Sequence, residues 1–151
     1  MEEKNRKILV ALDFTEKPEE ILKRSLSVAE KYNAEIFIVH VIEDMPKISF
    51  YSDAYKLWEE FRDKAVKETI EKINKYILEL SREFNFRNIE AIVEVGDSAT
   101  RIVEQAEKVD ADLIILGNHG RKGIKHFIHR NVCLHVIRMT TRPVLTFYTG
   151  S

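Results

Sequence analysis

The sequence predicts an α/β fold, in which a doubly wound, five-stranded parallel sheet carries helices on both faces. Short runs that are apolar along nearly their whole length are typical of strands buried on both faces of a parallel sheet. These runs alternate with segments of helical spacing, which predicts right-handed crossovers between parallel strands. The 151 residues, 44% hydrophobic and 32% charged, suffice for one globular, soluble domain that spans residues 1–151.

The first strand is predicted at residues 7–12 (KILVAL) and ends at Asp13. Pro18 marks the start of a helix whose apolar residues recur every three or four positions, and Asn33 closes it. The second strand is predicted at residues 35–42 (EIFIVHVI) and is followed by an irregular connection.

Residues 54 to about 84 contain neither glycine nor proline, and their apolar positions step by three and four. A helix of ~30 residues would be ~45 Å long, about twice the length of a typical strand. We therefore expect this helix either to break or to project beyond the sheet at its N-terminal end.

The second half of the chain is more regular. Strands are predicted at residues 89–95, 111–117 and 143–148. Asp97 or Ser98 caps the helix after the first of these strands. Asn131 caps the last helix, whose apolar positions are Val132, Val136, Ile137 and Met139.

Charge and cysteine content exclude several classes of protein. With 24 basic and 25 acidic residues the net charge is −1, which argues against a general nucleic-acid binder. One cysteine permits no intrachain disulfide and suits a reducing compartment. No apolar stretch near the N-terminus resembles a signal peptide or a membrane span. We expect a cytoplasmic protein without membrane or nucleic-acid partners.

The loops after the first and fourth strands are the predicted ligand site. In open α/β sheets, ligands bind beyond the carboxyl ends of the strands, where the strand order reverses. Asp13 lies in one of these loops, and Gly117 and Gly120 lie in the other, beside basic residues. Glycines let backbone N–H groups approach a ligand closely, and the basic side chains favour an anion. A strand, a glycine loop and a helix N-terminus together predict a cradle for phosphate or nucleotide.

Each of these features also has a purely structural interpretation. Asp13 could cap the turn after the first strand, and the glycines could serve only a tight turn. The basic residues of the loop could be ordinary solvated surface; they are Arg121, Lys122, Lys125 and Arg130. His40, within an apolar strand, is interpreted as a structural histidine.

Metal binding and enzyme activity have little support in the sequence. His126, His129 and Cys133 have the spacing of one helix face and could hold zinc, but no fourth ligand is evident and Cys133 is interpreted as a core residue. The chain contains no G-x-x-x-x-G-K-[ST], G-x-G-x-x-G or G-x-S-x-G motif. We predict neither catalytic residues nor a metal site.

Four segments together resemble the universal stress protein family. They are KILVALDFTEKPEEIL, FIVHVIED, GDSATRIVEQAEKVDADLIILGNHG and TTRPVL, and the resemblance covers essentially the whole chain. It implies a Rossmann-like sheet in the order 3-2-1-4-5 and a dimer. One branch of the family binds ATP, so the resemblance also implies an adenine nucleotide, with or without Mg²⁺.

The ATP-binding branch carries a glycine, two residues, a second glycine, nine residues, and then glycine with serine or threonine. Gly117 and Gly120 match the two glycines, but Arg130-Asn131 replaces the closing pair. The resemblance places Asp13 near the adenosine, Val41 against the adenine and His119 beside the phosphates. The implied site comprises Ala11, Leu12, Asp13, Val41, Leu116, Gly117, His119, Gly120, Arg130, Asn131 and Val132.

These observations predict an ATP-binding regulatory protein of the stress response. Because Arg130-Asn131 departs from the motif, the alternative is a nucleotide-free homodimer that acts through protein contacts. A slow ATPase or nucleotidyl-transfer enzyme is the third class. The dimer is expected to form through the last strand, where residues 144–148 lie at an apolar sheet edge.

Overall fold

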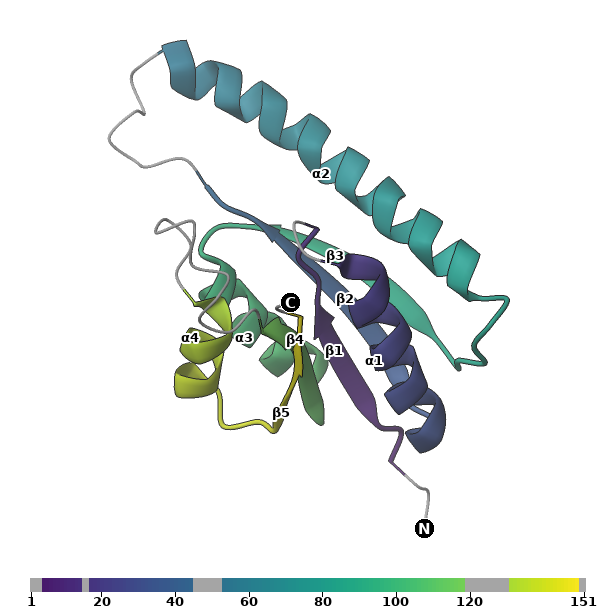
Figure 1. Cartoon of the computed structure of the whole chain (residues 1–151). Coiled ribbons are helices and arrows are strands. Elements are labelled where there is room, and N and C mark those ends of the chain that lie inside the picture. The colour runs from purple at the N-terminus through teal and green to yellow at the C-terminus, as the bar shows by residue number, and fades with distance from the viewer. Residues whose placement is uncertain (1–3, 15–16, 45–52, 119–130, 150–151) are drawn as a thin grey trace.

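The computed structural model describes residues 4–14, 17–44, 53–118 and 131–149. Strands and helices alternate along the described chain (Figure 1). In order they are β1 (Lys7–Ala11), α1 (Pro18–Tyr32), β2 (Glu35–Ile42), α2 (Asp53–Leu80), β3 (Ile89–Val95), α3 (Ser98–Val109), β4 (Leu113–Asn118), α4 (Val132–Met139) and β5 (Val144–Tyr148).

The sheet has five parallel strands in the order β3-β2-β1-β4-β5, which confirms the predicted fold class and strand order. β1 is the central strand. Its Val10 is the register partner of Ile38 on β2 and of Ile115 on β4, and all three side chains are completely buried. The apolar runs in the sequence therefore reflect strands that are covered on both faces.

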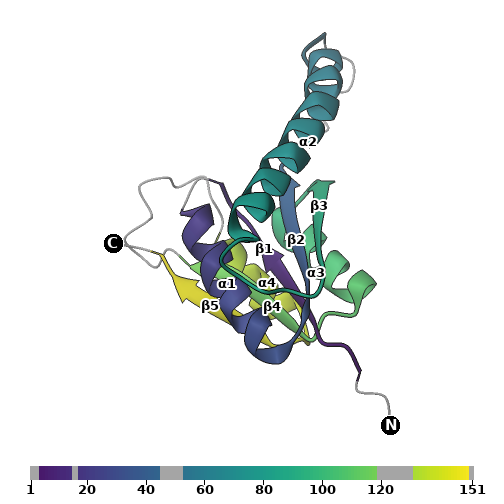
Figure 2. The same ribbon diagram turned by 90° about the vertical axis from the view of Figure 1, so that its right-hand side faces the viewer.

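Two apolar cores lie on opposite faces of the sheet, because successive side chains of a strand alternate in direction. Ile8, Val10 and Leu12 face α1 and α2 in what we call the first core. Leu9 and Ala11 face α3 and α4 in the second core. The two helix pairs accordingly lie on opposite sides of the sheet (Figure 2).

The predicted helix ends are confirmed by their capping geometry. Asn33 adopts a left-handed backbone conformation, and its N–H bonds the carbonyls of Ala29 and Glu30. Asp97 caps α3 by accepting a hydrogen bond from Thr100 N at 3.1 Å. Asn131 caps α4 in the same way.

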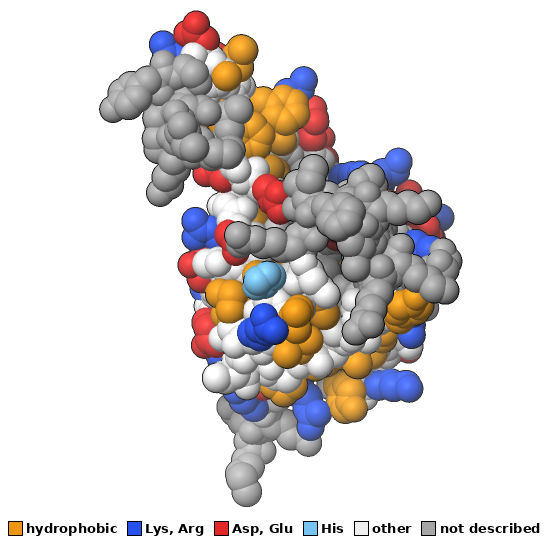
Figure 3. All heavy atoms as spheres, turned by 60° about the vertical axis from the view of Figure 1, so that its left-hand side comes forward, with side chains coloured by type: hydrophobic (Ala, Val, Ile, Leu, Met, Phe, Trp, Pro, Cys, Tyr) orange, Lys and Arg blue, Asp and Glu red, His pale blue; other side chains and the backbone are white. Residues whose placement is uncertain are grey.

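The long helix α2 is unbroken over 28 residues, and its N-terminal part projects past the end of the sheet (Figures 1 and 2). Its C-terminal half is anchored in the first core by Ile73 and Leu80. Leu57 and Phe61, by contrast, are 66% and 62% exposed. Figure 3 shows hydrophobic side chains on this projecting end. None of the helices in the described ranges is both long and apolar enough to cross a membrane.

Some predicted boundaries differ from the structure. β4 does not end at Gly117 but continues to Asn118, because Asn118 pairs with Tyr148 on β5. β1 ends at Ala11 rather than at the predicted Leu12, and β5 begins at Val144 rather than at the predicted Pro143.

The apolar positions of α4 do not all face the core. The helix buries Cys133 and Val136, whereas Ile137 and Met139 are about half exposed. A helix of eight residues turns only one narrow stripe of side chains toward the second core. Cys133 and Val136, three positions apart, form that stripe.

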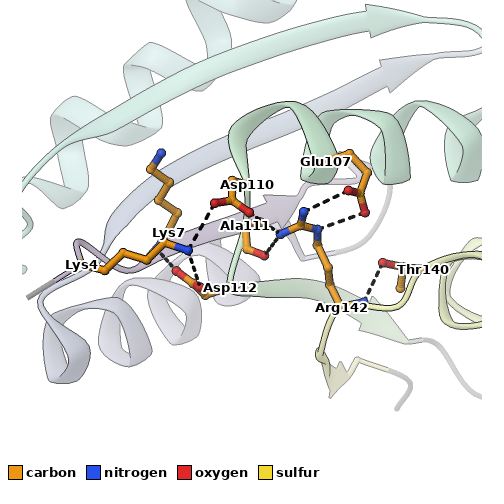
Figure 4. A network of polar contacts seen from close by, with 8 residues as sticks. All are labelled: Lys4, Lys7, Glu107, Asp110, Ala111, Asp112, Thr140 and Arg142. Carbon is orange, nitrogen blue, oxygen red and sulfur yellow. Dashed lines mark hydrogen bonds and ion pairs between the residues drawn. The ribbon is translucent and has the colours of Figure 1, made fainter.

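Arg142 ties the connection between α4 and β5 to the turn between α3 and β4 (Figure 4). Its guanidinium makes a bidentate pair with Glu107, with Nε–Oε1 and Nη2–Oε2 distances of 3.1 and 2.9 Å. Nη1 also donates to Asp110 Oδ1 at 3.1 Å and to the Ala111 carbonyl at 2.6 Å. The Arg142 side chain is only 19% exposed, so it spans the two connections from a partly desolvated position.

This network predicts a stability that depends on pH. Hydrogen bonds from Arg142 lower the pKa of Glu107 and the pKa of Asp110. A lowered carboxyl pKa contributes stability that is complete above the ordinary carboxyl values of about 4 and is lost as pH falls through the folded-state values. We expect Arg142→Met to lower the urea midpoint at pH 7, and its deficit relative to the wild type to shrink below about pH 4. Arg138→Met, on exposed α4 surface, is the control; a deficit independent of pH would contradict the prediction.

Candidate functional site

The carboxyl edge of the sheet brings three predicted site residues onto one apolar surface. Ala11 at the end of β1 is the register partner of Leu116 on β4. Val41 lies near the end of the neighbouring β2. All three side chains belong to the second core and are buried or nearly so. They form the apolar floor of the candidate site.

Polar groups border this floor on two sides. Asp13 lies two residues beyond the end of β1 and is exposed. On the other side α4 begins, with Val132 packed against the second core. Asn131 Oδ1 accepts a hydrogen bond from Leu134 N at 3.1 Å, so this side chain already caps the helix. The N-terminus of α4 carries the partial positive charge that favours an anionic group.

Two predicted site residues face the first core rather than the apolar floor of the candidate site. Leu12 is buried in the first core, so only its backbone can border the site. A Cβ added at Gly117 would lie 3.2 Å from Ile21 Cδ1 on α1. α1 therefore approaches Gly117 closely, and any role of this residue in binding belongs to its backbone.

Several predicted site residues lie outside the described residues: His119, Gly120 and Arg130, together with His126 and His129 of the zinc hypothesis. Cys133, the third member of that hypothesis, is buried, and burial raises the pKa of its thiol. A raised pKa disfavours the thiolate that zinc requires. Within the described ranges no three His, Cys, Asp or Glu side chains are grouped as metal ligands.

His40 and Phe14 contribute to this edge in a way that sequence reasoning missed. His40 Nδ1 donates to the Leu12 carbonyl at 2.7 Å, because a carbonyl oxygen can only accept. The Phe14 ring lies 4.8 Å from the His40 ring. These residues come from different strands and loops, so no local pattern in the sequence could indicate the contacts.

A polar depression of about 920 Å³ lies at the opposite, amino edge of the sheet. Two of its basic groups are already engaged: Arg87 Nη1 donates to Asn5 Oδ1 at 2.7 Å, and the Arg6 guanidinium lies over the Tyr32 ring. Ligands of open parallel sheets bind at the carboxyl ends of the strands, so we place the candidate site at the carboxyl edge.

The family comparison agrees with this architecture. The model of the universal stress protein family matches residues 4–147. The chain belongs to the universal stress protein family. Universal stress protein MJ0531 of Methanocaldococcus jannaschii is 27% identical over 141 residues, which cover 93% of this chain and 80% of that relative.

Solved structures of universal stress proteins have the same fold. The structure of MJ0577, also from Methanocaldococcus jannaschii, superposes with a TM-score of 0.76 at 28% identity and covers 97% of both chains. A universal stress protein in complex with cAMP superposes with a TM-score of 0.67 at 20% identity, over 98% of this chain and 100% of that one. At that identity the second likeness concerns the fold alone.

Proposed function

We propose that this universal stress protein binds an adenine nucleotide, ATP first, at the carboxyl edge of the sheet. The observation that carries the proposal is the convergence of Ala11, Val41 and Leu116 on one apolar floor. Such a floor suits the face of an adenine ring, while Asp13 suits ribose hydroxyls and the start of α4 suits phosphates. The cAMP complex of a relative with the same fold supports this ligand class.

The proposed role is regulatory rather than enzymatic, in the cytoplasm, with nucleotide as a bound effector. A ligand that binds only the folded protein stabilises it by mass action, so occupancy would be linked to stability. Mg²⁺ would accompany the phosphates of ATP. Sustained ADP release by purified protein would instead indicate a slow ATPase.

One observation favours the alternative of a nucleotide-free protein that acts through protein contacts. Asn131 stands where the ATP-binding branch has serine or threonine, and its side-chain oxygen is engaged with Leu134 N. Arg130 precedes it in place of glycine. A side chain committed to the cap is less available to phosphate, whereas a guanidinium can pair with phosphate directly.

We expect Asp13→Asn to weaken ATP binding by about tenfold or more, which corresponds to about 1.4 kcal/mol. The change keeps the shape of the side chain and removes the carboxylate, which accepts hydrogen bonds more strongly than an amide. Gly120→Val should weaken binding as well. Calorimetric titration with ATP, with and without Mg²⁺, measures the effect.

Glu79→Gln is the matched control, because this exposed carboxylate lies near the C-terminal end of α2, which leads back to the amino edge of the sheet at the start of β3. It should bind ATP as the wild type does. Unchanged affinity in both site variants would place the nucleotide elsewhere. A wild type that binds no ATP, and releases no nucleotide on denaturation, would leave the nucleotide-free alternative.

We further propose that the protein is a homodimer joined through β5, one of the two edge strands of the sheet. Ile114 N donates to the Pro143 carbonyl at 2.9 Å. In a parallel pair alternate residues direct their backbone groups to the same neighbour, so Leu145 faces β4 whereas Thr146 faces the free edge. Antiparallel pairing of two such edges closes a two-fold dimer.

Thr146→Pro removes an outward N–H group and should therefore convert the dimer to a monomer with little loss of folding. Leu145→Pro removes an inward group and should instead lower the urea midpoint. Light scattering at micromolar concentration checks the first outcome. A wild type that stays at 17.7 kDa on concentration, or a dimer that survives Thr146→Pro, would contradict an interface through β5.

A further inference from the structure

The residue pair on either side of Asp13 is held by contacts from two different elements. Leu12 is fixed by β2, because Leu12 N donates to the Val39 carbonyl at 2.8 Å and the Leu12 carbonyl accepts from His40 at 2.7 Å. Both polar groups of the Leu12 main chain are thus satisfied by one strand.

Phe14 is held by α2 as well as by His40 on β2, whose ring lies 4.8 Å from the Phe14 ring. Its ring is stacked with Tyr76 at 6.3 Å between centroids and 18° between planes. Lys72 Nζ lies 4.3 Å from the centre of the same ring, in the geometry of a cation–π contact. Lys72 and Tyr76 are one helical turn apart on α2, and Ile73 between them is completely buried.

We propose that Phe14 couples α2 to the nucleotide site by fixing the backbone that carries Asp13. Leu12 is pinned to β2, and Phe14 packs against both His40 and α2, so the Asp13 main chain between them has little freedom to move. Any contact that displaces α2 would release Phe14 and misplace the carboxylate. The expected effect on ATP binding rests on the proposed nucleotide site. The coupling between α2 and the Asp13 backbone is itself a property of the ligand-free protein.

His40 and Lys72 are the positioning residues that test this coupling. His40→Leu removes the donor to the Leu12 carbonyl, whereas His40→Asn places an amide N–H near the position of Nδ1. Lys72→Met keeps the aliphatic stem and removes the cation from the Phe14 ring. Lys75→Met, on an exposed position of the same helix, is the matched control.

Amide hydrogen exchange over residues 12–14, measured on the full chain without nucleotide, is the primary readout. We expect faster exchange in His40→Leu and Lys72→Met, and wild-type exchange in His40→Asn and Lys75→Met. ATP affinity should fall about two- to tenfold in the first two variants and recover in His40→Asn.

Unchanged exchange in Lys72→Met overturns the proposal, and this exposed variant keeps it testable even if His40→Leu does not fold. Equal exchange in His40→Leu and His40→Asn would also overturn it, since the donor would then have no role. A wild type without affinity for ATP overturns the proposed function, while the exchange rates still decide whether α2 and the Asp13 loop are coupled.

Discussion

Replacing Ile73 with alanine is expected to lower the free energy of unfolding by about 2–5 kcal/mol, whereas Leu57→Ala on the same helix should change it by less than about 0.5 kcal/mol. Ile73 is completely buried in the first core, so truncation leaves a cavity under α2. Leu57 lies on the projecting part and is 66% exposed. Urea unfolding, followed by circular dichroism, measures both values.

The comparison of Ile73→Ala with Leu57→Ala tests whether α2 packs against the sheet only along its C-terminal half. Both substitutions introduce alanine into one helix, so differences in helix propensity nearly cancel. A large cost for Leu57→Ala would mean that the projecting part is covered in solution. A stability that rises with protein concentration in the wild type, and not in this variant, would identify the cover as a second copy.

Gly96→Ala is expected to destabilise the protein by about 1–3 kcal/mol. Gly96 has a φ of 144°, a conformation that L-residues rarely adopt. An added Cβ would also lie 2.6 Å from Arg101 Nε. That nitrogen is not free to move away without cost, because it donates to the Val95 carbonyl at 3.1 Å and the same guanidinium pairs with Glu104.

A double-mutant cycle separates backbone strain from the clash. In an Arg101→Ala background the clash disappears, so the remaining cost of Gly96→Ala reports strain alone. Gly117→Ala is the matched control, because its φ lies outside the left-handed region and its new Cβ would meet the flexible end of Ile21 at 3.2 Å, with Thr149 Cγ2 at an ordinary contact distance of 3.6 Å. Equal costs at the two glycines would show that φ at Gly96 is not the cause.

Much of the fold could be predicted from the sequence because its signals are local. Apolar runs mark strands that are buried on both faces, and Asp97, Asn131 and Asn33 mark helix ends through contacts within a few residues. The projection of α2 was predictable from length alone. Its unbroken course was not, because helical spacing does not say which part of a helix will be docked.

The candidate site was less predictable, because its geometry depends on the face of the sheet to which each side chain points. Leu12 and Gly117 lie at the carboxyl edge, but the Leu12 side chain and a Cβ at Gly117 face the first core. Alternation along a strand decides this, and a shift of one residue reverses it. The bond from His40 to Leu12 joins residues 28 positions apart, so a histidine within an apolar strand gave no indication of its partner.

The strand order has a consequence for synthesis on the ribosome. β1 is completed at Ala11, but its second neighbour, β4, begins only at Leu113. At a synthesis rate of roughly 5–20 residues per second, one edge of β1 lacks its partner for roughly 5–20 s. An unpaired apolar edge is a template for association with other nascent chains. The strand that is most protected in the finished protein is therefore the most vulnerable one while the chain is being made.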